Sequence, residues 1–288
     1  MPSQILHTLF GEDVIQAASS ALRVRFGPAA ERLRGQLLRD YRGPFALGCQ
    51  GPDIFYHSQM TVPVALEYGA LLHRRAYGTF TAALLSLALP APDRELDALG
   101  AYALAFMTHA LLDRRCHPYI IYHSGWADGK GRGAFPPMAS LGKAAHPFFE
   151  RILDSLMIEY LRALPVSAWD QEALLSDPCG TPPEGLKELL AGALRAAFPE
   201  RAGPDGKLER RIANALEDCA FFYRYTAPRR TSFRNRLNRL DRLNRPDWLD
   251  QALLRELPLA YCYPEALPLD IDYLNLARRT WPSPAGDG

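Results

Sequence analysis

The chain has 288 residues, of which 48% are apolar, and a formal net charge of +1. This length and apolar content are enough to fill the core of one large domain. A charge so close to zero gives no indication of a partner selected by bulk electrostatics, such as nucleic acid or acidic lipid.

The cysteines and the N-terminal residues bear on the compartment. The five cysteines are scattered and form no CxxC pair, which argues for a reducing compartment and against disulfides or a thiolate zinc site. The first residues lack the basic and apolar regions of a signal peptide. No apolar run approaches the roughly 18–20 residues of a membrane span. We therefore expect a soluble, cytoplasmic protein.

Apolar residues recur at helical spacing along most of the chain, and the alternation typical of strands is scarce. Gly27-Pro28 is expected to separate the first two helices, and Pro118 to bend a later one. The Gly- and Pro-rich segment 124–139 is expected to be a loop. The sequence predicts an all-α fold with helical segments over 12–26, 28–41, 64–89, 95–123, 141–163, 184–198, 207–223 and 247–256.

The chain contains no internal repeat and no clean linker. We expect a metal-binding catalytic core over 1–164, a C-terminal helical extension packed on it over 165–281, and a disordered tail over 282–288. The stretch 224–245 holds eight arginines. A solvated helix face explains this stretch better than a phosphate-binding patch, since acidic and amide residues dilute it.

All seven histidines lie before residue 147, and two of them begin helix-spaced pairs with carboxylates. The pairs are His109 with Asp113 and His146 with Glu150, and residues four apart share one face of a helix. Imidazole and carboxylate are zinc ligands at about 2.0–2.2 Å. A buried Asp113 would cost on the order of several kcal/mol unless it were paired or metal-bound. His117 extends the pattern by one more turn, so we expect one multi-metal site.

Local chemistry leaves the other candidates open. Asp53 follows the turn Gly51-Pro52, which can aim it into a cleft, although it could equally be a turn or N-cap residue. His73 could be a ligand or a helix-surface histidine, and His7 alone would be unremarkable. His57 is expected to be structural or to support a ligand, and His123 is not expected to be a ligand.

Motifs for other chemistries are missing from the sequence. It has no HExxH, no adjacent His-Asp doublet, no Walker A loop, no GxSxG and no dinucleotide fingerprint. Cys116 adjoins His117, but a cysteine nucleophile would leave the two histidine–carboxylate pairs unexplained.

Five segments taken in order resemble the zinc-dependent phospholipase C family of bacteria. They are MPSQILHTLFGEDV, GCQGPDIFYH, GALLH, FMTHALLDRRCHPYI and HPFFERILDS. The resemblance covers about residues 1–160, and DYLNLARRTW near the C-terminus adds to it. It implies a single multi-helix domain of the phospholipase C/P1 nuclease type, a fold shared with single-strand-specific nucleases.

The resemblance also implies three zinc positions. The first would be held by His73, His109 and Asp113 with Asp53 close by, and the second by His117, His146 and Glu150. The third would be held by His7, which would share Asp113 as a bridge. In secreted relatives that zinc also takes the amine of an N-terminal Trp. This chain begins Met1-Pro2, so removal of Met1 would offer the Pro2 amine instead.

The activity implied is phosphodiester hydrolysis with two to three zinc ions, which lower the pKa of bound water. Asp53 would orient or deprotonate the attacking water. The substrate would be a glycerophospholipid or a small phosphate ester, with peripheral membrane contact, and Trp126 and Phe135 could cover the cleft.

Two alternatives remain. A nuclease or phosphomonoesterase on the same scaffold would bind nucleic acid or nucleotides through an aromatic slot, for which Tyr56 and Phe135 are candidates. A helical metal-binding protein without catalysis is the other.

Overall fold

The computed structural model describes residues 4–89, 95–124, 145–169 and 182–227. Within these ranges the chain is helical and forms no strand, so the predicted all-α class is confirmed. Contacts divide the chain into two compact units. The described residues of unit 1 come from 4–112 and 182–227, and those of unit 2 from 113–124 and 145–169.

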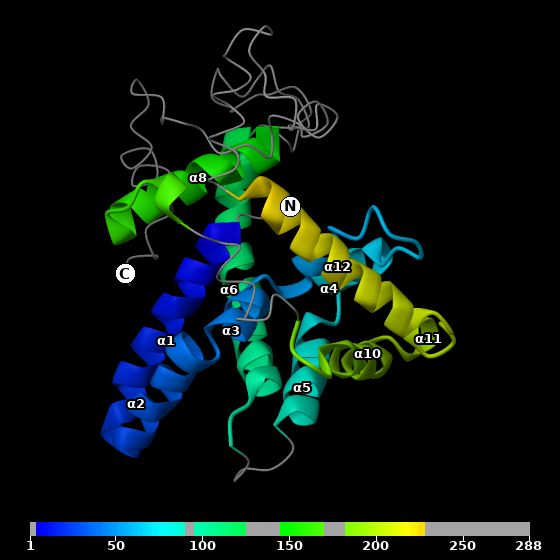
Figure 1. Cartoon of the computed structure of the whole chain (residues 1–288), viewed down its shortest axis with the longest axis horizontal. Helices are drawn as coiled ribbons and strands as arrows, with labels where there is room; N and C mark the ends of the chain where they lie inside the picture. The colour runs from blue at the N-terminus through cyan, green and yellow to red at the C-terminus, as the bar shows by residue number, and fades with distance from the viewer. Residues whose placement is uncertain (1–3, 90–94, 125–144, 170–181, 228–288) are drawn as a thin grey trace, which may run out of the picture. The chain divides into compact units, whose positions relative to one another are not determined.

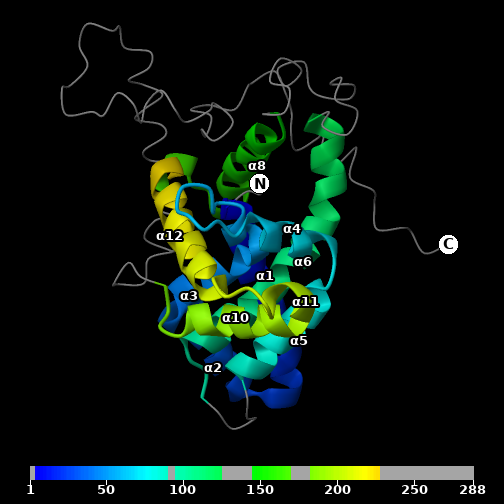
Figure 2. The same cartoon turned by 90° about the vertical axis from the view of Figure 1, so that its right-hand side faces the viewer.

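Unit 1 is a bundle of helices in which α1 and α2 lie side by side, and α10 packs against α5 and α12 (Figures 1 and 2). Its elements are α1 (Gln4–Phe26), α2 (Pro28–Gly35), the π-helix η1 (Gln36–Asp40), α3 (Arg42–Cys49), the 3₁₀-helix η2 (Gly51–Phe55), α4 (Leu66–Arg74), α5 (Tyr77–Ala88), the first part of α6 (Ala98–Ser124), α10 (Leu186–Ala197), α11 (Pro199–Ala202) and α12 (Leu208–Thr226).

Two predicted helix boundaries have different outcomes. Gly27 separates α1 from α2 with φ of 51°, as Gly27-Pro28 predicts. The segment 64–89 is not one helix, because α4 ends at Arg74 and α5 begins at Tyr77. Ala76 between them has φ of 58°, a left-handed conformation that a non-glycine residue adopts at some cost. No glycine or proline marks this break, so periodicity alone could not reveal it.

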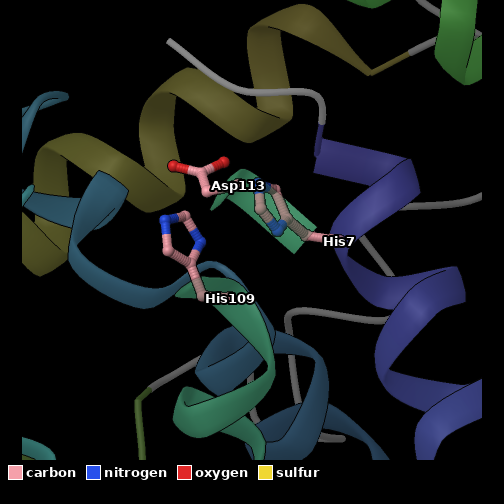
Figure 3. A group of neighbouring side chains, drawn as sticks. All are labelled: His7, His109 and Asp113. Atoms are coloured by element: carbon pink, nitrogen blue, oxygen red, sulfur yellow. The ribbon is translucent and has the colours of Figure 1, made fainter. Parts of the chain in front are cut away.

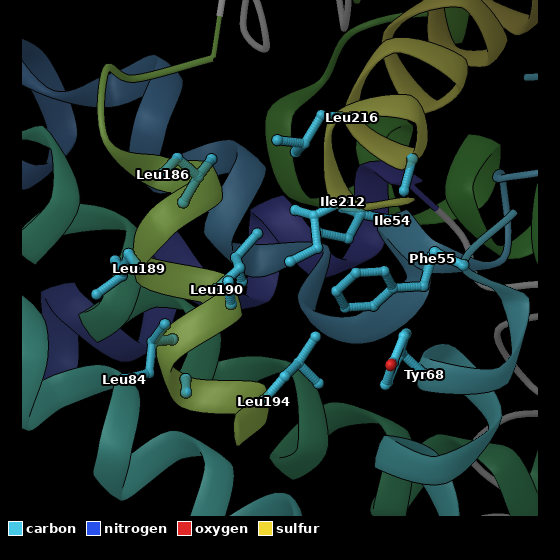
Figure 4. Close-up of a cluster of buried hydrophobic side chains, with 14 of the residues drawn as sticks. Ile54, Phe55, Tyr68, Leu84, Leu186, Leu189, Leu190, Leu194, Ile212 and Leu216 are labelled. Atoms are coloured by element: carbon cyan, nitrogen blue, oxygen red, sulfur yellow. The ribbon is translucent and has the colours of Figure 1, made fainter. Parts of the chain in front are cut away.

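The core of unit 1 is apolar and reaches the element that carries Asp53. Figure 4 shows Ile54 and Phe55 of η2 among leucines of α10 and side chains of α12. Both residues are fully buried. Because they directly follow Asp53, their burial fixes the backbone from which this carboxylate projects.

Side chains of α12 also hold the connection between η2 and α4. Asp218 accepts hydrogen bonds from the backbone N–H groups of Met60 (2.9 Å) and Thr61 (3.0 Å), and from the Thr61 hydroxyl (2.6 Å). Asn214 donates to the carbonyl of Pro63 at 3.0 Å. The connection is therefore anchored through its backbone, although Met60 is exposed.

The described residues of unit 2 form the second part of α6, α8 (Ala145–Arg162) and the 3₁₀-helix η4 (Val166–Ala168). α6 continues through Pro118 to its end at Ser124. Tyr119 of α6 and Phe149 of α8 have ring centroids 5.9 Å apart, and Phe149 is fully buried. This contact joins the two helices that carry the predicted ligands of the unit.

Several predictions concern segments outside the described residues. These are the loop 124–139 beyond Ser124, with Trp126 and Phe135, the arginine stretch beyond Ala227, the helix over 247–256 and the tail over 282–288. The predicted division into 1–164, 165–281 and 282–288 stays a prediction. Among the described helices, none combines the length and the apolar character needed to cross a membrane.

Candidate metal centre

Unit 1 brings Asp53, His73 and His109 together from η2, α4 and α6. One ligand atom from each lies within 4.8 Å of the other two. His73 Nε2 is 3.0 Å from Asp53 Oδ1, and His109 Nε2 is 3.8 Å from Asp53 Oδ2. Asp53 and His109 are almost completely buried, whereas His73 is partly exposed. Three residues far apart in the sequence thus form one compact group of potential ligands.

The separations within this group fit a shared metal ion. Ligands at about 2.1 Å from a tetrahedral zinc ion lie about 3.4 Å from one another. The observed 3.0 Å and 3.8 Å, which are measured to the two different oxygens of Asp53, lie on either side of that value. The longer distance exceeds that of a hydrogen bond, yet it is suitable for two ligands of one cation. The donor set of two imidazoles and a carboxylate therefore fits zinc.

The hydrogen bonding of His73 points the same way. Its Nδ1 lies 2.8 Å from the carbonyl oxygen of Gly69. A carbonyl only accepts, so Nδ1 is the protonated nitrogen that donates. The other nitrogen, Nε2, then needs either a second proton or a metal cation between itself and the Asp53 carboxylate at 3.0 Å. Metal-ligating histidines are usually oriented by such a bond to a backbone carbonyl.

His7 of α1 lies against His109. Their rings stack with centroids 4.2 Å apart at 16°, and His7 is buried. Figure 3 shows the two rings with Asp113, which follows His109 by one turn of α6. The sharing of Asp113 by His7 and a third zinc position stay predictions, as does ligation by Pro2, which lies outside the described residues.

Gly51 is required for the approach of η2 to α6. Its φ is 56°, and a Cβ placed there would lie 2.3 Å from Cγ of His109. Gly48 has a similar role, since its Cβ would lie 2.3 Å from the carbonyl oxygen of Tyr102. The interpretation of GCQGPD as a tight turn with close backbone contact is thus confirmed.

A buried amide joins the elements of this cluster. Gln50 Nε2 lies 3.2 Å from the carbonyl oxygen of Gln4 and 3.2 Å from the hydroxyl of Thr8, on either side of His7. Its Oε1 accepts a hydrogen bond from the Tyr223 hydroxyl at 3.1 Å. Its backbone carbonyl accepts from the N–H of Asp53 at 3.2 Å. Gln50 therefore holds α1, η2 and α12 in register around the ligands.

Unit 2 contains a second group, formed by His117 of α6 with the helix-spaced pair His146 and Glu150 of α8. His117, His146 and Glu150 each offer an atom within 4.8 Å of the others. His146 Nε2 is 3.0 Å and His117 Nε2 is 3.8 Å from Glu150 Oε1. His117 Nδ1 is also 3.3 Å from Asp113 Oδ2. The two separations from Glu150 Oε1 again lie around the value for shared ligands of one zinc ion, and Asp113 lies at the other nitrogen of His117.

The eight predicted ligands divide equally between the units. Unit 1 holds His7, Asp53, His73 and His109, and unit 2 holds Asp113, His117, His146 and Glu150. His57 belongs to neither group. Its ring stacks on Phe222 with centroids 4.1 Å apart, which agrees with its predicted structural role. The side chain of His123 lies outside the described residues.

The surroundings of Cys116 favour the protonated form of its thiol. Burial, together with the negative charges of Asp113 and Glu150, raises the pKa of its thiol to about 12. A thiol with such a pKa stays protonated at neutral pH and is a poor nucleophile and metal ligand.

Sequence reasoning missed the residues that support the clusters. Gln50, Asp218 and Tyr223 have no motif of their own, and their partners are distant in the sequence. The one available signal was the position of Gln50 inside the Gly-rich turn before Asp53.

Comparison of the chain with protein-family models, curated proteins and solved structures finds no match. Membership of the phospholipase C family therefore stays a prediction, and an argument about function depends on the residues of the two clusters.

Proposed function

We propose that the protein is a zinc-dependent phosphodiester hydrolase that acts on glycerophospholipids or related phosphate esters. The observation that carries the proposal is the pair of three-ligand histidine–carboxylate clusters, one in each unit. Structural zinc sites are closed by four protein ligands, whereas catalytic sites keep one position for water or substrate. Among the described residues each cluster offers three ligands, which corresponds to the second kind.

The residues that would hold zinc are those of the two clusters. When bound, zinc ions neutralise the charge of a phosphate ester and make water acidic enough to ionise near neutral pH. Two imidazoles and a carboxylate suit this metal, and neither group contains a thiolate. Zinc is accordingly the proposed metal.

Asp53 is the proposed catalytic residue. Both of its oxygens lie among imidazole nitrogens, Oδ1 toward His73 and Oδ2 toward His109. This carboxylate can orient a water molecule and accept its proton, because the buried Ile54 and Phe55 fix its position. Tyr56, whose ring stacks on His73 at 4.8 Å, holds that imidazole in place.

Hydrolysis of nucleic acid or of phosphomonoesters is the second candidate. The ring of Tyr56 lies at the partly exposed side of the unit 1 cluster, and an aromatic ring beside a phosphate site can stack a base. This is one platform, whereas tight binding of single strands uses several.

The test is hydrolysis by zinc-loaded and chelator-treated protein of bis-p-nitrophenyl phosphate, p-nitrophenylphosphorylcholine, phosphatidylcholine vesicles and single-stranded DNA. We expect zinc-dependent hydrolysis of the first three substrates and its loss in Asp53→Asn. Cleavage of DNA alone would favour the nuclease. Zinc binding without hydrolysis of any ester would leave a non-catalytic metal-binding protein.

A further inference from the structure

The corner between α1 and α2 presents apolar side chains to solvent. All residues of 20–26 are exposed, and the exposed fractions of Val24, Phe26 and Leu22 are 94%, 51% and 40%. Leu33 of α2 is exposed as well. We call residues 20–34 the α1–α2 tip (Figure 1). The exposed side chains of the tip do not hold α1 against α2. That contact is made by the buried Ser19 and Ala30, where the Ser19 hydroxyl donates a hydrogen bond to the Ala30 carbonyl.

The same region concentrates positive charge. Residues 20–34 contain four arginines and one acidic residue, Glu31, which pairs with Arg34 at 2.9 Å, whereas the whole chain has a net charge of only +1. The remainder of the chain is therefore slightly negative. Arg23, Arg25 and Arg32 are exposed on the tip, and the guanidinium of Arg25 lies 5.2 Å from the centroid of the Phe26 ring.

Helix stability explains only part of this pattern. Arg23 and Arg25 lie in the last turn of α1, where positive charge interacts favourably with the helix dipole. The interaction with the helix dipole does not explain why the neighbouring Val24 and Phe26 are apolar and exposed. Exposed apolar side chains beside arginines can instead enter a membrane interface while the arginines contact the lipid phosphates.

We propose that the α1–α2 tip binds the surface of an anionic lipid bilayer. Val24 and Phe26 enter the interface, and the arginines contact phosphates of the headgroups. The way these apolar side chains are distributed around the axis of α1 favours a bilayer over a protein partner. Leu22 and Phe26 are four residues apart and share one side of α1, whereas Val24 projects from nearly the opposite side. A protein groove uses one stripe of a helix, whereas a fluid interface surrounds a tip.

The tip holds the protein at the membrane and does not contact the reacting phosphate. Phe26 lies 19 residues after His7 on α1, which corresponds to about 28 Å at the helical rise of 1.5 Å per residue. The inference therefore does not rest on the proposed hydrolysis, and metal-free protein is expected to bind lipid equally well.

The test is co-sedimentation of the full chain with vesicles of phosphatidylcholine alone or mixed with phosphatidylglycerol. We expect binding to the anionic vesicles only, weakened by salt. The double variants Val24→Ser/Phe26→Ser and Arg23→Gln/Arg25→Gln are each expected to lose about tenfold or more in affinity. Val62→Ser and Arg201→Gln are matched controls at exposed positions elsewhere in unit 1 and should bind like the unaltered protein.

Two results would overturn the proposal. One is absence of binding to anionic vesicles, or binding that both double variants retain in full. The other is binding to polyglutamate but not to vesicles, which would assign the tip to an acidic protein. Circular dichroism of each variant excludes unfolding as the cause of a loss.

Discussion

The two clusters differ in how the chain builds them. The unit 1 group gathers Asp53, His73 and His109 from three elements, and its carboxylate and one imidazole are almost completely buried. The unit 2 group lies on two helices, and its His117 is 31% exposed. The first depends on the tertiary core and the second mainly on helical periodicity. In exposure the two groups are alike, since each has a buried carboxylate, a buried imidazole and one partly exposed imidazole, His73 at 19% and His117 at 31%.

The largest expected effect is the loss of the unit 1 metal in His73→Ala. Removal of a ligand should weaken zinc binding by this cluster more than hundredfold, because changes in supporting residues alone cost ten- to hundredfold. Zinc titration by calorimetry should then show only the unit 2 step. Arg74→Ala, exposed on the same helix, is the control. Loss of both steps together would show that the clusters are not separate.

Glu150→Gln should remove the step of the zinc titration that belongs to the unit 2 cluster. The amide keeps an oxygen but lacks the negative charge that lies 3.0 Å from His146 Nε2, so zinc affinity in unit 2 should fall by about hundredfold or more, beyond the effect of a supporting residue. Glu159→Gln on the exposed side of α8 is the matched control. Unchanged binding of both ions would contradict ligation by Glu150.

Gln50→Leu tests whether a residue that holds the helices around the unit 1 ligands, without being a ligand, affects zinc binding. The variant keeps every ligand of unit 1 but removes the hydrogen bonds of the Gln50 amide that hold α1 and α12. We expect a roughly tenfold weaker unit 1 zinc step and a loss of about 2–3 kcal/mol in the free energy of unfolding. Gln59→Leu at an exposed position is the control. A fall in stability with full zinc affinity would make Gln50 only structural.

Asp218→Ala should affect stability alone. It leaves the N–H groups of Met60 and Thr61 without their carboxylate acceptor, at a cost of about 2–4 kcal/mol in the free energy of unfolding. Both zinc steps should persist, because Asp218 anchors the η2–α4 connection and is outside both groups. Urea unfolding measures the cost, and Glu217→Ala, exposed one residue earlier, is the control.

The same contrast explains what the sequence could predict. The pairs His109–Asp113 and His146–Glu150 could be inferred because helical spacing alone puts both members on one face. The turn at Gly51-Pro52 could also be predicted from the sequence, since glycine adopts its left-handed backbone conformation without strain and leaves room for the approach to His109.

Other features depend on tertiary contacts that no local pattern encodes. The break at Ala76 has no glycine or proline signal. The meeting of Asp53 with His73 and His109 requires the packed core, and the resemblance to phospholipases, not spacing, suggested it. Gln50 and Asp218 bond to residues 46 and 157–158 positions away, respectively, and such pairs are invisible in a single sequence.

The central claim is that each unit holds its own zinc cluster. Its most direct test is elemental analysis of chelator-treated protein after reconstitution with zinc and removal of excess, with unaltered protein, His73→Ala, Glu150→Gln and the double variant side by side. The account predicts at least two zinc ions per chain in the unaltered protein, one fewer in each single variant and two fewer in the double variant. Less than one ion in the unaltered protein, or an unchanged count in all three variants, would contradict it.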